Sequence, residues 1–389
     1  MKQKLIIRHF IIGLLVFLLS PLASGQEKPR KADDLVWLQG TVNMRLGGWF
    51  FSVLDGKSGK TLWGRSKHPI MQGNTVYFGG IHIYARELKT GKEKWRSQLG
   101  GEVIAADKDM VFFLDYRKLE PRKYVATIHA LDARDGSPKW SRKMPGYYEN
   151  EDATHCVACT ADGNLIVFTG SFSAAYDKSN GKIIWKNQRP ETSDSMDESD
   201  RAEAADGVVV AQTGALWSEI SARNIKTGVQ LWKISLATSG SISNRFDIDN
   251  GVLYFQPQAG SFSAFDIRTG RRLFDLPRIK ATSFKVKDKI LFYLSSIEQD
   301  PKAKYPLNTP IAALHAFDLS SRTPMWERQL GNWGEASVER VTENAVYVIA
   351  SNRGDHSTAF CIVKKTGKIF WRNEAASAVE GTSRFMVTE

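Results

Sequence analysis

Several residue patterns that mark common enzyme classes are missing from this chain of 389 residues. It has three cysteines and seven histidines, and the first cysteine is Cys156. No G-x-S-x-G nucleophile elbow, Walker phosphate loop or H-E-x-x-H zinc motif occurs. No apolar run reaches the roughly 20 residues of a comfortable transmembrane helix. The sequence therefore nominates no catalytic residues and predicts no stable membrane span in the mature chain.

Acidic residues are fewer than basic ones. The chain has 42 Asp and Glu against 53 Lys and Arg, a formal net charge of +11, of which the first 25 residues supply +3. No block of Lys and Arg is dense enough to predict nucleic-acid binding. The excess is either an ordinary solvated surface or a preference for anionic partners such as lipid headgroups and acidic proteins.

The first 25 residues have the pattern of a secretory signal peptide. A basic start is followed by an apolar run from Phe10 to Leu19 and by small residues before Gln26. We expect cleavage before Gln26 and a flexible lead-in over residues 26–35. Because a lipoprotein would carry cysteine where Gln26 stands, we expect a periplasmic or secreted protein that is not a lipoprotein.

Two cysteines lie close together but do not predict a site. Cys156 and Cys159 fall on an expected strand, where residues three apart are separated by about 10 Å. This separation is too long for a disulfide, so two unpaired thiols are expected. His155 adds only one further zinc ligand. The acidic segment 191–200 lacks the spacing of a calcium loop and is either a solvated loop or a weak cation site. We predict no metal site.

The pattern A-x-D-x-x-x-G-x-x-x-W recurs eight times, at intervals of 32 to 52 residues. Its last position is held by Trp63, Trp95, Trp140, Trp185, Trp232, Phe274, Trp326 and Trp371. Four residues earlier stand Gly59, Gly91, Gly136, Gly181, Gly228, Gly270, Arg322 and Gly367. Such a period in a strand-rich chain predicts propeller blades of four strands each.

Each repeat position has a physical reason. Glycine takes the positive φ of a tight turn, and the Asp or Asn before it can accept hydrogen bonds from that turn. The small alanine is expected to receive the indole of a neighbouring blade. The tryptophans are therefore expected to be structural anchors between blades.

The whole region 36–389 is thus predicted to be one all-β domain, an eight-bladed β-propeller of four-stranded antiparallel blades. Blade one has a hairpin over 49–63 and an earlier strand near 42–46, but it lacks an innermost strand. Residues 382–387 resemble the innermost strand 282–286. We therefore predict that the C-terminal strand pairs into blade one and closes the ring, which removes the exposed edges.

Variable connections are expected on one face of the propeller only. Turns between the first and second strands, and between the third and fourth, are short in every blade. The other connections vary in length and, from strand direction, project from the opposite face, which we call the decorated face. Trp49, Trp217 and Trp333 map to this face and are either binding anchors or packing at the channel mouth.

The repeat resembles that of the pyrroloquinoline-quinone (PQQ) type β-propellers over residues 36–389. That resemblance implies two functional branches on one fold. One branch, the quinoprotein dehydrogenases, holds the quinone and calcium in the central channel, often with adjacent cysteines that this chain lacks. The other resembles BamB, a periplasmic scaffold of outer-membrane protein assembly, and its blades are similarly compact.

We therefore expect a monomeric, non-catalytic scaffold without a cofactor that binds outer-membrane or other cell-envelope proteins. A PQQ-dependent oxidoreductase that uses quinone and calcium is one alternative. A binder of cell-surface carbohydrate through the tryptophans of the decorated face is the other.

Overall fold

The computed structural model divides the chain into two units, Met1–Asp33 and Asp34–Glu389. All described residues lie in the second unit, so the expected signal peptide is outside them. The described residues are 35–42, 48–55, 61–65, 69–120, 123–144, 156–169, 172–188, 201–213, 219–235, 246–256, 261–277, 279, 281–297, 311–333, 335–351, 357–373 and 384–387.

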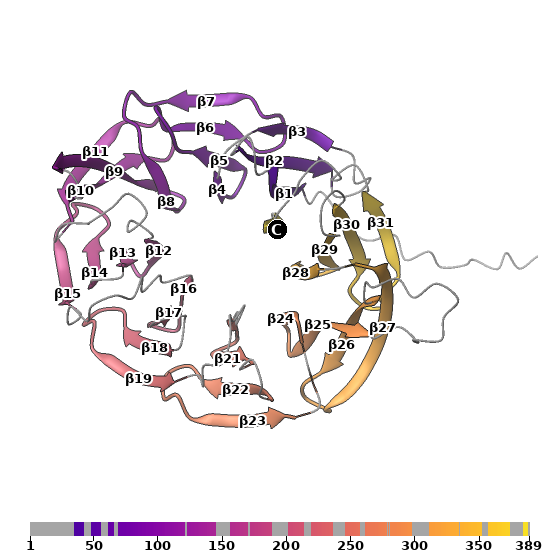
Figure 1. Cartoon of the computed structure of the whole chain (residues 1–389). Coiled ribbons are helices and arrows are strands. Elements are labelled where there is room, and N and C mark those ends of the chain that lie inside the picture. The colour runs from indigo at the N-terminus through magenta and orange to yellow at the C-terminus, as the bar shows by residue number, and fades with distance from the viewer. Residues whose placement is uncertain are drawn as a thin grey trace, which may run out of the picture. The chain divides into compact units, whose positions relative to one another are not determined.

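The described residues form eight four-stranded antiparallel sheets that follow one another around a common axis (Figure 1). The predicted all-β, eight-bladed propeller is confirmed, and no helix occurs among these residues. Blades one to four comprise β1 (Leu35–Val42), β2 (Gly48–Asp55), β3 (Thr61–Arg65) and β32 (Arg384–Val387); β4 (Pro69–Gln72), β5 (Thr75–Phe78), β6 (Tyr84–Glu87) and β7 (Glu93–Arg96); β8 (Glu102–Ala106), β9 (Met110–Glu120), β10 (Lys123–Asp132) and β11 (Pro138–Lys143); β12 (Val157–Ala161), β13 (Asn164–Phe168), β14 (Phe172–Asp177) and β15 (Ile183–Gln188).

In the other four blades, as in blades two to four, the strands follow chain order from the axis outward. They comprise β16 (Arg201–Ala205), β17 (Val208–Thr213), β18 (Glu219–Asn224) and β19 (Gln230–Ser235); β20 (Phe246–Asp249), β21 (Val252–Phe255), β22 (Phe262–Asp266) and β23 (Arg272–Leu276); β24 (Ser283–Lys287), β25 (Ile290–Ile297), β26 (Ile311–Asp318) and β27 (Thr323–Asn332); β28 (Glu335–Val341), β29 (Ala345–Ser351), β30 (Ser357–Val363) and β31 (Ile369–Asn373).

The C-terminal strand closes the ring as predicted. β32 pairs with β1 in antiparallel register from Val36 opposite Val387 to Gln39 opposite Arg384. The sheet order is β3-β2-β1-β32, so the last strand of the chain is the innermost strand of the first blade. Closure leaves no sheet face at the ends of the ring without a neighbouring blade.

Two details of the first blades differ from expectation. The strand predicted near residues 42–46 is β1, which lies earlier, at Leu35–Val42. Blade two has an innermost strand, β4, in a region where the pattern predicted none. β4 has only four residues, which is too short for a clear period-2 signal.

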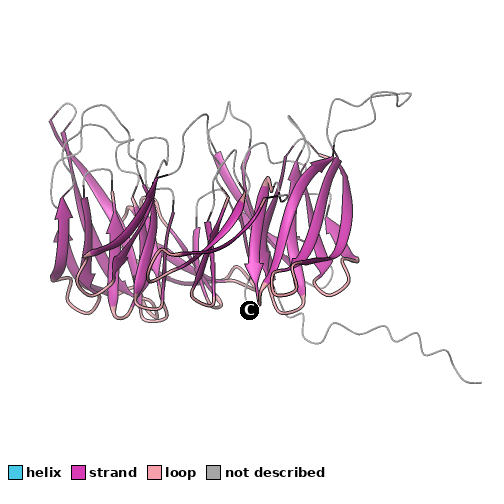
Figure 2. Ribbon diagram, turned by 90° about the horizontal axis from the view of Figure 1, so that it is seen from below, coloured by secondary structure: helices cyan, strands magenta, loops and turns pink. Residues whose placement is uncertain are grey.

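The short turns gather on one face of the ring (Figure 2). Turns between first and second strands use positive-φ pairs such as Asp162-Gly163, Asp206-Gly207 and Asn250-Gly251. Residues with short polar side chains and glycine tolerate this conformation, which joins strands closely. Most of the expected variable connections, among them residues 189–200 and 298–310, lie outside the described residues.

The outer edge of every blade is interrupted by a bulge. Register between the third and fourth strands shifts next to the residue paired with the repeat Trp or Phe, as at Ala222 opposite Trp232 and Arg223 opposite Gln230. The residue before the aromatic one is left without a partner in the ladder. Bulges twist an edge strand and hinder pairing with another chain, so the rim is a poor acceptor for an added strand.

The apolar core lies between neighbouring blades. Phe112 and Leu114 of β9 pack in one buried cluster with Leu165 and Val167 of β13. Similar clusters join the other described blades. Each blade therefore depends on its two neighbours for burial of its faces, which makes the junctions between blades the structural unit of the fold.

Candidate functional site

At five junctions the indole of one blade lies directly on the turn glycine of the next. A Cβ built on that glycine would come within 2.5–2.6 Å of the indole, so no other residue fits without movement. The pairs are Trp95 and Gly136, Trp140 and Gly181, Trp185 and Gly228, Trp232 and Gly270, and Trp326 and Gly367. These glycines also have φ near +70°. Glycine is therefore required at these positions both by the positive φ and by the indole of the neighbouring blade.

The same indoles donate their N–H across the junction. The acceptor is the carbonyl of the residue after the repeat Asp, Asn or Val, at 2.7–3.0 Å. The acceptors are Ala133, Lys178, Ile225, Ile267 and Lys364. Each of these anchors thus contributes apolar burial and one satisfied hydrogen bond across the junction.

The small residue expected to receive the neighbour's indole was the wrong one. The repeat alanine is paired with the tryptophan of its own blade, as Ala130 is with Trp140. Glycine receives the indole of the preceding blade. Spacing along the chain gives the register within a blade but cannot show which residue of the next blade lies beneath an aromatic ring.

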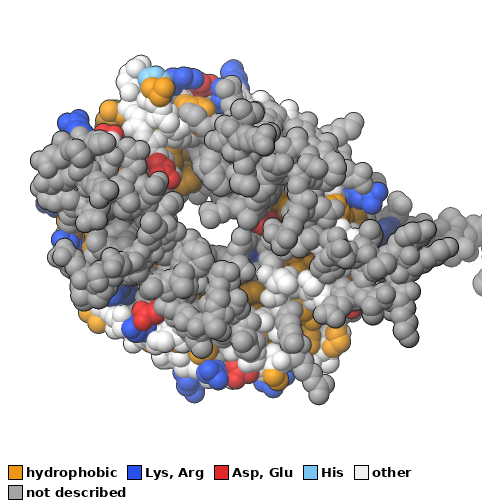
Figure 3. Space-filling model, viewed as in Figure 1, with side chains coloured by type: hydrophobic (Ala, Val, Ile, Leu, Met, Phe, Trp, Pro, Cys, Tyr) orange, Lys and Arg blue, Asp and Glu red, His pale blue; other side chains and the backbone are white. Residues whose placement is uncertain are grey.

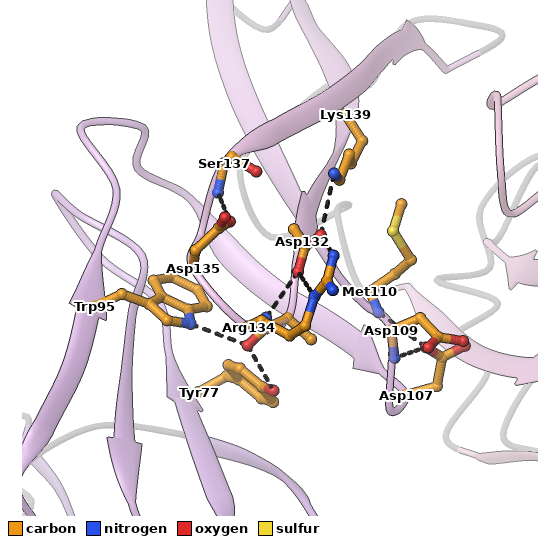
Figure 4. A network of polar contacts seen from close by, with 11 residues as sticks. Tyr77, Trp95, Asp107, Asp109, Met110, Asp132, Arg134, Asp135, Ser137 and Lys139 are labelled. Atoms are coloured by element: carbon orange, nitrogen blue, oxygen red, sulfur yellow. Dashed lines mark hydrogen bonds and ion pairs between the residues drawn. The ribbon is translucent and has the colours of Figure 1, made fainter.

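Figure 4 shows the polar side of the junction between blades two and three. Trp95 Nε1 and the Tyr77 hydroxyl both donate to the Ala133 carbonyl, at 3.0 and 3.4 Å. Beside it, the buried Asp132 carboxylate accepts from Arg134 and Lys139. The side-chain hydrogen bonds of Arg134 hold the pKa of Asp132 well below its usual range, with help from the Arg134 backbone N–H and from Lys139. This network stabilises the turn and does not resemble a reaction centre.

One junction departs from the repeat on both sides. Phe274 replaces the tryptophan of blade six, and Arg322 replaces the glycine of blade seven, with φ of 57°. The Arg322 guanidinium lies 5.5 Å from the centre of the Phe274 ring. Phenylalanine has no N–H to offer the Leu319 carbonyl, the position that accepts an indole elsewhere. The junction of blades six and seven is therefore held by different contacts.

Trp333 is the one candidate binding anchor whose side chain the structure describes. It is half-buried, and its Nε1 donates to the Leu330 carbonyl at 3.0 Å. Its ring meets Phe360 edge to face, with centroids 6.1 Å apart. Trp333 thus packs on blade eight with part of its ring exposed.

The other two candidates are placed less fully. Trp49 lies in β2, where its backbone pairs with Thr41. Trp217 lies outside the described residues.

The rim carries exposed apolar side chains between cations. In six consecutive blades the bulge residue is apolar and 40–45% exposed, namely Ile184, Leu231, Leu273, Met325, Phe370 and Leu62. Figure 3, which views the decorated face, shows apolar and basic side chains around the periphery. Single exposed apolar residues are common on proteins, so this belt is not assigned as a site.

The cysteines behave as predicted. Cys156, Cys159 and Cys361 are all free thiols. Cys156 packs with the core between blades three and four, and Cys159 with that between blades four and five. Burial raises the pKa of both, for Cys159 to about 12. Neither is a reactive thiolate at neutral pH.

The donor set for a quinoprotein centre is not found in the part of the chain that the structure describes. No group of three His, Cys, Asp or Glu side chains there is placed to hold a metal ion. The sequence has no adjacent cysteine pair, and Cys156 and Cys159 face different blades.

Two histidines that sequence reasoning passed over occupy equivalent places. His129 in blade three and His315 in blade seven each directly precede the repeat alanine. Each ring stacks on an aromatic neighbour, with centroids 4.9 Å apart for Phe113 and 4.6 Å for Tyr293. Burial lowers the pKa of both. Their shared repeat position was the available signal.

The closed ring of four-stranded blades joined by indole anchors defines the class: this is a β-propeller, and its repeat is similar to that of the PQQ type. Residues 51–214 match the family described as outer membrane protein assembly factor BamB. The chain is thus a propeller of PQQ-like repeats similar to BamB, as its repeat predicted.

Two curated relatives are both 24% identical to this chain. Tetrathionate hydrolase of Acidithiobacillus ferrooxidans matches over 291 residues, 61% of this chain and 56% of the relative. Outer membrane protein assembly factor BamB of Moranella endobia matches over 247 residues, 56% of this chain and 60% of the relative. The chain thus spans less than two thirds of the length of each. The crystal structure of BamB from Moraxella catarrhalis shares the fold, with a TM-score of 0.53 at 14% identity over 79% of this chain and 87% of that one.

Proposed function

We propose that this protein is a cell-envelope scaffold that binds protein partners through its decorated face, in outer-membrane protein assembly. The observation that carries the proposal is the asymmetry between the two faces. Short turns with inter-blade ion pairs, such as Lys178 with Asp107 at 2.7 Å, make one face uniform from blade to blade. The connections on the other face differ in length, which is where a rigid scaffold normally binds.

Other properties support the same role. The similarity to BamB supports an envelope location, either periplasmic or secreted after cleavage of the signal peptide. Among the described residues, no helix is long and apolar enough to cross a membrane. The bulged rim makes strand addition there unfavourable, so partners are expected on the decorated face and the protein itself as a monomer.

The test is in-cell cross-linking with a photoreactive residue at position 333, followed by identification of the cross-linked envelope protein. We expect an adduct with a component of the outer-membrane assembly machinery. The same residue at position 108, an exposed site in a short turn on the opposite face, is the matched control. No adduct at 333, or equal adducts at both positions, would overturn the proposal.

The two alternatives are separated by direct measurements. An absorbance change and dye reduction on addition of PQQ and calcium would favour an oxidoreductase. Binding on a glycan array that is lost on replacement of Trp333 would favour a carbohydrate binder.

A further inference from the structure

Blade seven brings a serine, a histidine and a glutamate into one line across three adjacent strands. Ser295 Oγ in β25 lies 2.7 Å from His315 Nε2 in β26. His315 Nδ1 lies 3.5 Å from Glu327 Oε2 in β27. A hydroxyl on one imidazole nitrogen and a carboxylate on the other is the arrangement that activates a serine nucleophile.

The partners define the tautomer of the histidine. An ionised carboxylate can only accept a hydrogen bond, so the Nδ1 that faces Glu327 carries the proton. Nε2 is then free to accept from the Ser295 hydroxyl. Burial lowers the pKa of His315 while Glu327 opposes that shift, so the ring is neutral at neutral pH.

The ring is held in place from both sides of the ladder. His315 is directly opposite Tyr293 in β25 and Glu327 in β27. The Tyr293 and His315 rings are stacked, with an interplanar angle of 12°. Rigid strands therefore fix the geometry, which is what a preorganised site requires.

The line is also reachable from solvent. The His315 side chain is 18% exposed and that of Glu327 is 50% exposed. Ser295 is half-buried and stands two residues before the end of β25, on the decorated side of the blade.

Blade three provides an internal comparison. His129 Nδ1 lies 2.7 Å from Ser141 Oγ, and nearby Asp115 raises the pKa of that histidine against the larger effect of burial. Here the serine is on the fourth strand and the acid on the second, the reverse of blade seven. The described contacts include no carboxylate on the second nitrogen of His129. Blade three thus has half of the arrangement.

Ser295, His315 and Glu327 lie in blade seven, next to the junction where the repeat residues are replaced. Tyr293, on which His315 stacks, packs in the same apolar cluster as Phe274 of blade six. Phe274 and Arg322 are the departures described above. Local departures from an otherwise consistent pattern are expected where a protein maintains a function at the cost of a regular contact.

We propose that Ser295 is an activated nucleophile toward carboxylic esters, with His315 as general base and Glu327 as the positioning residue. Ser295 Oγ forms a bond to the ester carbonyl carbon while its proton passes to His315 Nε2. The carbon–oxygen bond to the alcohol then breaks, and the alcohol leaves with that proton. Water repeats the sequence, which releases the acid and restores the serine. This activity goes beyond the scaffold role and does not depend on it.

The test is labelling of the folded protein with a fluorophosphonate probe, with mass spectrometry of the modified peptide, and hydrolysis of p-nitrophenyl acetate. We expect the label on Ser295 and its loss in Ser295→Ala. His315→Gln should slow labelling by about 100-fold or more, the usual contribution of a general base. Ser141→Ala is the matched control and should label at the normal rate.

Glu327→Gln tests whether Glu327 positions His315. The readout is the pH profile of labelling, which a loss of packing alone would not shift. Tyr293 and Glu327 are the titratable side chains seen to contact the ring, and Glu327 raises the histidine pKa. Its removal should shift the pH profile of labelling to lower pH as well as slow the reaction. Each variant is first checked for an unchanged melting temperature. If Ser295→Ala fails this check, Ser295→Thr takes its place. Absence of label on Ser295 in the wild-type protein, or labelling that His315→Gln leaves unchanged, would overturn the proposal. Cross-linking at position 333 would remain unaffected in either case.

Discussion

Phe274 and Arg322 face each other across the junction of blades six and seven, with the guanidinium 5.5 Å from the ring centre. They are the sequence positions at which the repeat replaces its tryptophan and its glycine, and they meet at one junction. At five other junctions a Cβ on the glycine would lie 2.5–2.6 Å from the indole. The two departures are therefore one compensated change, in which a smaller ring accommodates a residue that has a side chain.

This pairing predicts a strong coupling between the two positions. Phe274→Trp alone should destabilise the protein by about 1–3 kcal/mol, because the larger ring overlaps the Arg322 side chain. Arg322→Gly alone should be nearly neutral, since relief of the positive φ offsets loss of a cation–π contact of about 0.5–1 kcal/mol. The double variant restores the repeat and should be more stable than Phe274→Trp. Chemical denaturation of the wild type, the two single variants and the double variant measures the coupling. Additive changes in the free energy of unfolding would contradict the compensation.

The turn glycines beneath the indoles should be less replaceable than glycines of similar conformation elsewhere. Gly181 has φ of 71° and lies under Trp140, whereas Gly163 has φ of 79° and no atom within 4 Å of its Cβ position. Gly163→Ala should cost about 1–2 kcal/mol for the left-handed backbone alone. Gly181→Ala should cost about 1–3 kcal/mol more through overlap with the indole. If both variants lost the same free energy of unfolding in urea, the indole contact would contribute nothing to stability.

Closure by β32 predicts a sharp dependence on the last residues. Removal of 384–389 deletes the innermost strand of blade one and leaves the β1 edge without its partner. We expect a lower melting temperature and faster proteolysis within residues 35–65. Removal of 388–389 alone, beyond β32, is the control and should change neither. An unaltered melting temperature in the longer deletion would show that the ring closes without this strand.

Asp132 predicts a defined acid dependence of stability. Its folded-state pKa lies below the ordinary value near 4, so it contributes stability above about pH 4 that is lost as the pH falls below that value. Asp132→Asn keeps the turn acceptor, as Asn224 does in blade five, but loses the charge that pairs with Arg134 and Lys139. The variant should be less stable by about 1 kcal/mol at pH 7, and the difference should shrink between pH 4 and pH 2. Urea midpoints across this range measure it; a constant difference would be inconsistent with the pKa shift.

Much of the fold could be predicted because its signals are local. In blade three the apolar alternation over 102–106, 110–115, 124–132 and 138–142 is sufficient to predict four strands, and these fall on β8 to β11. Alternating apolar residues and glycine turns are sufficient there, since each hairpin is defined within a few residues. In blade one the strand expected near residues 42–46 lies earlier, at Leu35–Val42. Its innermost strand, β32, was nevertheless predicted correctly, because residues 382–387 resemble an innermost strand.

The candidate site was predicted only in part, for a similar reason. Trp333 could be assigned to the decorated face from strand direction, but its contacts with Leu330 and Phe360 depend on packing. Ser295, His315 and Glu327 could not be grouped from spacing, because the loop over residues 298–310 separates two of them. Their approach follows from strand register across β25, β26 and β27.

The sequence by itself determined the number of blades, the turns that join their strands and the residues that anchor each blade, because these repeat with a local period. Tertiary structure alone decided that glycine lies beneath the neighbouring indole, that Phe274 meets Arg322, and that a serine, a histidine and a glutamate share one line. Those contacts join strands or blades that the sequence separates by 12 to 48 residues. Their geometry depends on register and on how whole sheets pack, which no local pattern of residues specifies.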